Sequence, residues 1–256
     1  MLVCPCGLDV SSRSLRFLAD RLREHQCRIG SRRRRLPAGR QALLTVAHLR
    51  NGTTYAQLAA GFRIGTSTVY RYIREAVDLL ATLAPTLDEA VRAASTKAYV
   101  LLDGTLLPID RVAADRPFYS GKHKRHGMNV QILTDPFGRL LWASPALPGA
   151  VHDVRAAREH GIIDALEEAG IDCWADKGYQ GARGTIKVPY RGRWKTLSAG
   201  QQAVNRSQAK IRALVEQAMA TLKTWRLLRK LRCSTTRITT LVQAILTLHQ
   251  ASSDAG

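Results

Sequence analysis

Two aspartates stand where short, mostly apolar runs end in the middle of the chain. Residues 99–102 lead into Asp103, and residues 171–175 lead into Asp176. A carboxylate at the end of a buried strand is costly unless it pairs with or coordinates a cation. On neighbouring strands, these two carboxylates and a helical glutamate would supply hard oxygen ligands of the kind that Mg²⁺ prefers. Two such ions about 3.5–4 Å apart can activate water and stabilise the leaving oxygen, so the pattern favours phosphodiester cleavage.

Glu216 is the candidate for that glutamate. From Lys177 onward the sequence holds 15 Lys and Arg, and its only acids are Glu216 and Asp254. On a helix predicted over residues 201–229, Glu216 lies away from the apolar face and four residues after Arg212. Spacing leaves two readings open, because Glu216 could be a metal ligand or could form an exposed ion pair with Arg212, worth about a few tenths of a kcal/mol.

The charge of the chain indicates a polyanionic partner. The 256 residues include 39 Lys and Arg against 20 Asp and Glu, a net charge of +19, and the pI is near 10.5. Residues 1–95 hold 15 basic and 7 acidic groups, residues 96–176 hold 9 and 11, and residues 177–256 hold 15 and 2. Two basic regions around an acidic middle favour nucleic acid as the partner. The alternative is a basic surface that only keeps the protein soluble.

The remaining composition excludes several protein classes. An apolar content of 45% and a charged content of 23% exclude wholesale disorder. No apolar run approaches the ~18 residues that span a bilayer, and no secretory signal is visible, so we expect a soluble intracellular protein with no membrane partner. Five scattered cysteines, an odd number, do not indicate a disulfide framework. A zinc site built from Cys4, Cys6, His25 and Cys27 lacks the usual ligand spacing, and reduced thiols are the favoured alternative.

The N-terminal region has the pattern of a helix-turn-helix. Helices are expected over residues 11–27 and 38–51, followed by a short helix over 55–60 and a basic helix from about residue 66. A turn containing glycine joins the last two, as in a helix-turn-helix over about residues 53–80. The buried stripe of the basic helix is expected to be Val69, Ile73, Val77 and Leu80. The outer residues, which can reach base edges and phosphates in a major groove, are Ser67, Thr68, Tyr70, Arg71 and Arg74.

We assign this N-terminal region to a DNA-binding domain over residues 1–95. The alternative is a three-helix bundle with a basic surface.

From residue 97 the sequence pattern predicts both strands and helices. Strands are expected over residues 99–103, 106–109, 128–133, 140–143 and 171–176, with residues 135–138 as a hairpin turn. Helices are expected over residues 152–169 and 201–229. This order indicates an α/β domain over residues 96–256.

Five motifs in this second region occur in a fixed order. They are Leu102–Thr105, Tyr119–Lys124 with His126 and Asn129, Pro148–Asp153, Ala175–Gly181, and Asn205 with residues 212–216 and 222–225. Together they resemble the DDE-superfamily transposases of bacterial insertion sequences, close to the Harbinger-like endonuclease group. The resemblance runs from about residue 99 to residue 232, and a preceding helix-turn-helix domain is frequent in such proteins.

The resemblance implies a ribonuclease H-like catalytic core, a mixed sheet flanked by helices, after the small all-α domain. It identifies Asp103, Asp176 and Glu216 as the catalytic residues and as ligands of two Mg²⁺ ions, for which Mn²⁺ could substitute. It gives supporting roles to His152, Asp153 and Arg212, with helix capping as the alternative for Asp153. Basic residues of the motifs and of the C-terminal third are expected to contact DNA phosphates or carboxylates: Lys122, Lys124, Lys177, Arg191, Arg193 and Lys223.

The expected function is that of a transposase in the bacterial cytoplasm, associated with the nucleoid. Such a protein would bind double-stranded DNA at the terminal inverted repeats of a mobile element, cleave it and join the 3′ end to target DNA, as a homo-oligomer assembled on DNA. The alternative is a catalytically silent DNA-binding protein derived from a transposase. A protein that merely coats nucleic acid would not explain the carboxylates.

Overall fold

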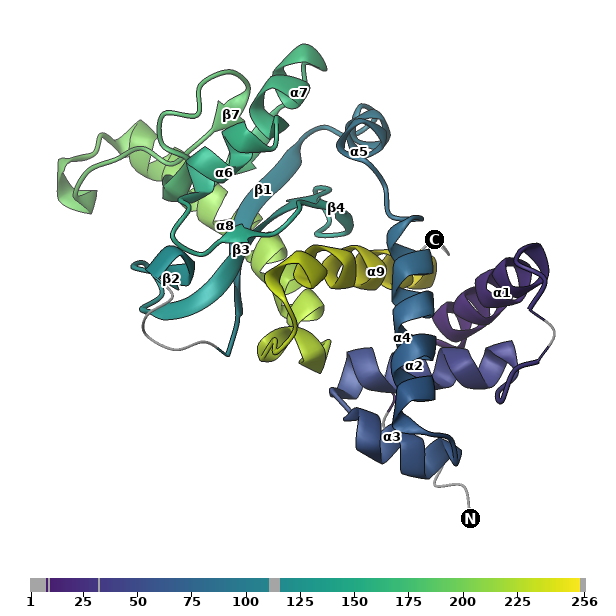
Figure 1. Cartoon of the computed structure of the whole chain (residues 1–256). Coiled ribbons are helices and arrows are strands. Elements are labelled where there is room, and N and C mark those ends of the chain that lie inside the picture. The colour runs from purple at the N-terminus through teal and green to yellow at the C-terminus, as the bar shows by residue number, and fades with distance from the viewer. Residues whose placement is uncertain (1–7, 9, 32, 111–115, 254–256) are drawn as a thin grey trace. The chain divides into compact units, whose positions relative to one another are not determined.

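The computed structural model describes residues 8, 10–31, 33–110 and 116–253, and these form two compact units (Figure 1). One unit takes its described residues from Met1–Ala84 and Leu222–Gly256, and the other takes them from Pro85–Thr221. The zinc alternative for Cys4 and Cys6 falls outside the described residues.

Helices build the first unit. They are α1 (Ser12–Arg28), α2 (Ala38–Asn51), α3 (Tyr55–Phe62), α4 (Thr66–Ala81), the 3₁₀ turn η4 (Arg226–Arg229) and α9 (Thr235–Ser253). Local sequence sets their ends, because Ser11 caps α1, Thr54 and Gln57 form a capping box at α3, and Gly52 closes α2 with a φ of 67°. None of these helices, nor any other in the described residues, has the length and apolar character needed to cross a membrane.

The apolar face of α4 lies at the centre of this unit. The four residues predicted as its buried stripe, Val69, Ile73, Val77 and Leu80, are all buried. α9 packs beside α4 and α1, and the Thr247 hydroxyl donates to the Leu80 carbonyl at 3.0 Å. The apolar residues of α9 are thus buried in the helical unit. The packing therefore divides the chain after Ala84 and again before Leu222, which differs from the expected division into residues 1–95 and 96–256.

A mixed sheet builds the second unit. Its strands are β1 (Val100–Pro108), β2 (Tyr119–Ser120), β3 (Arg125–Thr134), β4 (Leu140–Ala143), β5 (Leu147–Pro148), β6 (Cys173–Ala175) and β7 (Ile186–Lys187). They run in the order β2-β3-β1-β6-β7, and β4 and β5 also pair with β3. β1 is antiparallel to β3 and parallel to β6.

Helices flank this sheet. They are α5 (Leu87–Ala94), α6 (Asp153–Glu159), α7 (Ile162–Glu168) and α8 (Ala199–Lys223), with 3₁₀ turns η1 (Arg116–Phe118), η2 (Lys177–Tyr179) and η3 (Trp194–Thr196). Ala157 of α6 and Leu166 of α7 share one apolar cluster with Leu102 and Leu133 of the sheet. Because side chains alternate along a strand, Asp103 faces away from that cluster. The predicted mixed sheet flanked by helices is confirmed.

Several predicted elements have different bounds in the structure. Residues 99–103 and 106–109 form one strand, because Gly104 and Thr105 continue the ladder opposite β3. The helix expected over residues 152–169 is broken into α6 and α7 at Gly161, whose φ of 68° is left-handed. The long helix expected to residue 229 ends at Lys223. The predicted hairpin turn at residues 135–138 is confirmed, and Asp135 Oδ1 accepts there from two backbone N–H groups.

Candidate active site

β1 and β6 bring Asp103 and Asp176 to the same end of the sheet. The two strands pair in parallel with Leu102 opposite Ala175, so an aspartate follows directly on each strand. Asp103 Oδ1 accepts a hydrogen bond from the Gly104 N–H at 2.8 Å, and Asp176 Oδ1 accepts one from the Gly178 N–H at 2.6 Å. The prediction that the two strands are neighbours is therefore confirmed.

Asp153 reaches the same place from the first turn of α6. It is 9% exposed, and its Oδ2 accepts from Lys122 Nζ at 2.9 Å while its Oδ1 accepts from Asn129 Nδ2 at 3.0 Å. Lys122 Nζ also lies 3.8 Å from Asp176 Oδ2, so one ammonium group bridges two carboxylates. His152 occupies the N-cap of α6 without a side-chain capping bond. Lys122 and Asn129 thus hold the Asp153 carboxylate on the side of Asp176.

Two glycines leave room for the Asp153 carboxylate. A Cβ atom at Gly104 would lie 2.2 Å from Asp153 Oδ1, and a Cβ atom at Gly178 would lie 2.9 Å from Asp153 Oδ2. Both distances are shorter than a van der Waals contact, so neither position admits a side chain without moving the carboxylate. The glycines that follow Asp103 and Asp176 therefore allow a third acid to approach the pair.

A chain of buried polar side chains supports Asn129 from behind. Gln131 Nε2 donates to Asn129 Oδ1 at 2.9 Å, and the Tyr179 hydroxyl donates to Gln131 Oε1. All three residues are buried, and buried polar groups gain most when every partner is satisfied. Sequence reasoning gave no role to Gln131. The available signal was its position two residues after Asn129 in an otherwise apolar strand, because buried amides require hydrogen-bonding partners.

The cluster carries more acidic than basic groups. Burial first, and then the charges of Asp176 and Asp153, raise the pKa of Asp103 to about 6, against the opposing effects of the Gly104 N–H and Arg212. Burial lowers the pKa of Lys122, but its hydrogen bond to Asp153 and the charges of the acids raise that pKa overall. This excess of negative charge favours the binding of a cation.

Glu216 lies on α8 outside this cluster. Its side chain is 69% exposed, and its Oε1 is 3.9 Å from Arg212 Nη2. Arg212 in turn lowers the pKa of Asp103 by its charge. The structure therefore links Asp153 and Asp176 through Lys122 and places both acids and Arg212 within electrostatic reach of Asp103, whereas the Glu216 carboxylate is exposed beside Arg212.

The donor chemistry of the aspartates fits a divalent cation such as Mg²⁺. This ion is usually held by one or two carboxylates together with waters and substrate phosphates, and Asp103 and Asp176 present two carboxylates at one end of the sheet. The raised pKa of Asp103 is the effect expected of negative charge that a cation would compensate. Among the described residues, no three His, Cys, Asp or Glu side chains form a group that could hold a metal ion.

The other basic residues expected near DNA, apart from Lys223, are exposed on the sheet unit. Lys124 is exposed and has a φ of 51° in the turn between β2 and β3. Lys177 is exposed at the start of η2, and Arg191 and Arg193 are exposed in the segment before η3. Lys223, the last residue of α8, is half-buried.

The helix-turn-helix residues lie on α4 as the sequence predicted. Ser67, Tyr70, Arg71 and Arg74 are exposed, and Thr68 is half-buried. The Arg71 guanidinium is 3.5 Å from the Thr68 hydroxyl, and Arg74 Nη1 donates to the Tyr70 hydroxyl at 3.3 Å. Their polar ends are therefore presented on one surface of the helical unit.

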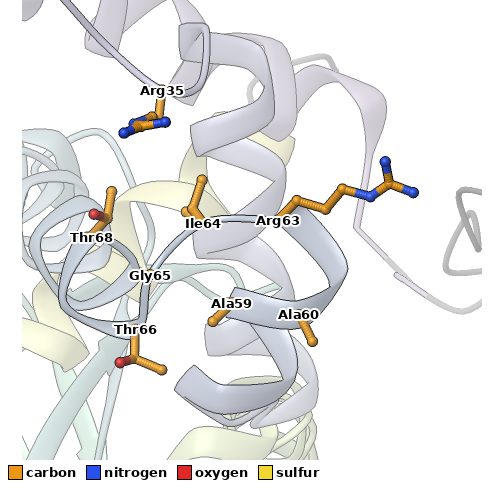
Figure 2. Close-up of a pocket in the computed structure, with 8 residues that line it drawn as sticks. All are labelled: Arg35, Ala59, Ala60, Arg63, Ile64, Gly65, Thr66 and Thr68. Carbon is orange, nitrogen blue, oxygen red and sulfur yellow. The ribbon is translucent and has the colours of Figure 1, made fainter.

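A pocket of about 580 Å³ lies at the turn between α3 and α4 (Figure 2). Its lining residues are Arg35, Ala59, Ala60, Arg63, Ile64, Gly65, Thr66 and Thr68. The N-cap residue Gly65 gives α4 no side-chain capping bond, so the positive end of the helix lies at this pocket beside Arg35. The Arg63 side chain extends away from the other labelled side chains (Figure 2). A phosphate group has the charge that this pocket favours.

Comparisons with known proteins match both units. A family profile described as "DDE superfamily endonuclease" matches residues 102–250, and one described as "Helix-turn-helix of DDE superfamily endonuclease" matches residues 34–86. A similar protein from Streptomyces albus G is described as "Putative transposase for insertion sequence element IS112". It is 32% identical over 202 residues, which cover 77% of this chain and 73% of that protein. No solved structure matches the chain.

Replacing Gly104 with alanine is expected to displace Asp153 and to destabilise the protein. The added Cβ atom would meet Asp153 Oδ1 and the Gln131 amide, and overpacking of this kind costs about 1–3 kcal/mol. The free energy of unfolding, measured in urea, checks this expectation. Gly200→Ala is the matched control, because a Cβ at that position meets nothing within 4 Å. Equal losses in the two variants would contradict the packing described for Gly104.

Replacing Asp103 with asparagine is expected to stabilise the metal-free protein above pH 6. The folded protein raises the pKa of Asp103 from 3.8 to about 6, so folding favours the protonated acid. Its contribution to stability is complete below pH 4 and is lost as the pH rises through 6. The free energy of unfolding of the variant minus that of the wild type should therefore be larger at pH 7 than at pH 4, by on the order of 1–3 kcal/mol. Urea unfolding of both proteins across this range in EDTA is the measurement, and parallel stability curves would contradict the pKa shift.

Proposed function

The chain belongs to the DDE superfamily of endonucleases and carries the helix-turn-helix of that superfamily, and on this premise we propose that it is an active transposase. In this proposal the helical unit binds the ends of a mobile DNA element. The sheet unit cleaves the DNA and joins the free 3′ end to target DNA, with Asp103, Asp176 and Glu216 as its catalytic residues.

The observation that carries the proposal is the parallel pairing of β1 with β6. It supports a shared role for Asp103 and Asp176, because each follows one member of the Leu102–Ala175 pair. If these half-buried aspartates had only a structural role, the energetic cost that raises the pKa of Asp103 would serve no function. Ligation of a cation by both carboxylates supplies that function.

The side chains of the cluster have distinct roles in this proposal. Asp103 and Asp176 hold Mg²⁺, with Mn²⁺ as a substitute, and the bound metal supplies water activation and charge stabilisation at the phosphate. Lys122 holds the carboxylates of Asp153 and Asp176 in place through its ammonium group. Asp153 in turn fixes Lys122 and Asn129. We assign two metal ions to the site. We also propose that Glu216 becomes a metal ligand once DNA binds Arg212 in place of Glu216.

DNA binding is assigned to two surfaces. In the helical unit, Ser67, Thr68 and Arg71 of α4 enter the major groove, and Arg35 with the start of α4 binds a phosphate. In the sheet unit, Lys124, Lys177, Arg191 and Arg193 are exposed cations that suit the DNA backbone. The protein is proposed to assemble as a homo-oligomer on the DNA ends.

A catalytically silent DNA-binding protein is the second candidate. The observation that favours it is the Glu216 side chain, which is 69% exposed and paired with Arg212. In that case the aspartate cluster would be retained without an assembled third carboxylate. DNA binding would be the same under both functions, so only a cleavage assay separates them.

Asp103→Asn, Asp176→Asn and Glu216→Gln are each expected to abolish cleavage of labelled element ends in Mg²⁺ and to leave DNA binding almost unchanged. The reason is that each change removes a proposed metal ligand, whereas DNA binding depends on basic residues elsewhere. Cleavage products on gels and affinities by anisotropy give the two readouts.

Asp164→Asn is the matched control for this series, because Asp164 is an exposed aspartate of α7. It should cleave like the wild type. Full activity of the Glu216 variant would remove that residue from the site, and full activity of either aspartate variant would overturn the proposed chemistry. Wild-type binding without cleavage in Mg²⁺ or Mn²⁺ would favour the silent protein.

Arg71→Ala is expected to weaken binding to the cognate DNA end by about 1–3 kcal/mol and to weaken binding to random DNA much less, because only base edges differ between the two. Arg191→Ala should weaken both complexes about equally and lower the slope of log affinity against log salt by about one unit. Titrations on both DNAs at several salt concentrations provide the comparison. Equal losses on both DNAs for Arg71→Ala would mean that α4 only binds the backbone.

A further inference from the structure

The helical unit holds a second basic feature, a groove of about 960 Å³ beside α4. One wall comes from the end of α2, from the start of α3 and from α4. The other comes from residues 226–241, which include η4 and the start of α9. Figure 1 shows α3, α4 and α9 in this unit. The residues of the second wall have no role in the proposed function.

The charge of the groove points to a polyanion. Its lining includes Arg74, Arg226, Lys230, Arg232 and Arg237, and no aspartate or glutamate among the described residues lines it. Asp78 does form an ion pair with Arg237 and lies 3.7 Å from Arg74, so part of this positive charge is compensated from beside the groove. Arg226, Lys230 and Arg232 lie in or next to η4.

Two exposed tyrosines lie among these cations. Tyr55 and Tyr70 are 38% and 44% exposed, and their rings meet edge to face with centroids 5.9 Å apart. Ile73, Val77 and Leu231 are buried residues that contribute to the same groove. A DNA duplex presents phosphates and base edges, whereas an unpaired strand also presents base faces, which stack on aromatic rings and apolar surfaces.

The segment that forms the second wall is held firmly in place. The Arg50 guanidinium lies 5.5 Å from the centroid of the Trp225 ring, and Arg50 also donates to the Thr224 hydroxyl. Leu228 and Leu231 are buried beneath the segment. The groove is therefore built by packing within one unit and does not depend on how the two units are arranged.

We propose that this groove binds an unpaired DNA strand, with bases stacked on Tyr55 and Tyr70 and phosphates bound by the cations of η4 and its neighbours. The inference rests on DNA being the partner of this family and does not depend on cleavage. It gives Tyr70 a stacking role in place of the major-groove contact expected from the sequence, because Tyr70 faces the groove together with Tyr55.

Binding of fluorescent oligothymidylate to the full chain tests this inference. Tyr70→Leu should weaken binding by about 5- to 100-fold, the loss expected for one stacked base, and Tyr70→Phe should retain it. Lys230→Ala should lower the salt slope by about 0.7, the value for one phosphate contact on a single strand. Tyr190→Leu is the matched control, because Tyr190 is 47% exposed and belongs to the other unit.

The outcomes separate the groove from the active site. Asp103→Asn should bind oligothymidylate like the wild type, so a failure of the catalytic proposal would leave this test readable. Circular dichroism of Tyr70→Leu checks that its exposed side chain is not needed for folding, and Tyr55→Leu provides the second stacking variant. Wild-type affinity in both tyrosine variants would overturn the proposal. Equal losses on duplex and single-stranded DNA would also overturn it and would identify the groove as a duplex surface.

Discussion

Repulsion between buried carboxylates is the constraint on which the sheet unit depends. Asp103 and Asp176 follow the paired strands β1 and β6, Asp153 lies in the first turn of α6, and the ammonium group of Lys122 contacts Asp153 and Asp176. The fold tolerates this arrangement because backbone N–H groups and Asn129 satisfy the oxygens, and because glycines give Asp153 space. The cost remains visible in the raised pKa of Asp103. A site of this kind is prepared to receive positive charge.

The sequence predicted much of this arrangement because strand periodicity and apolar runs are local signals. It identified the strands that carry Asp103 and Asp176, the buried stripe of α4 and the turn at Asp135. Local signals do not report how a side chain is oriented by distant partners. For that reason Asp153 could be given a capping alternative, although Lys122 and Asn129 hold its carboxylate from other elements.

The differences have the same physical origin. Helical spacing continued through Gly161 and beyond Lys223, whereas the backbone turns at the first position and the helix ends at the second. The position of α9 could not be read from periodicity, because an apolar helix face indicates burial and not the partner that buries it. Glu216 illustrates this limit for the site, since its spacing on α8 is compatible with ligation and with the ion pair to Arg212 that is present.

The packing of α9 against α4 and α1 has a consequence for how the protein is made. The helical unit takes residues from both sides of Pro85–Thr221, so the sheet unit is an insertion within it. Domains fold as units while the ribosome adds residues from the N-terminus. All residues of the sheet unit have emerged before α9 does, whereas α4 must wait for α9 to cover its apolar face. During synthesis, the sheet unit can therefore fold before the helical unit acquires its last helix.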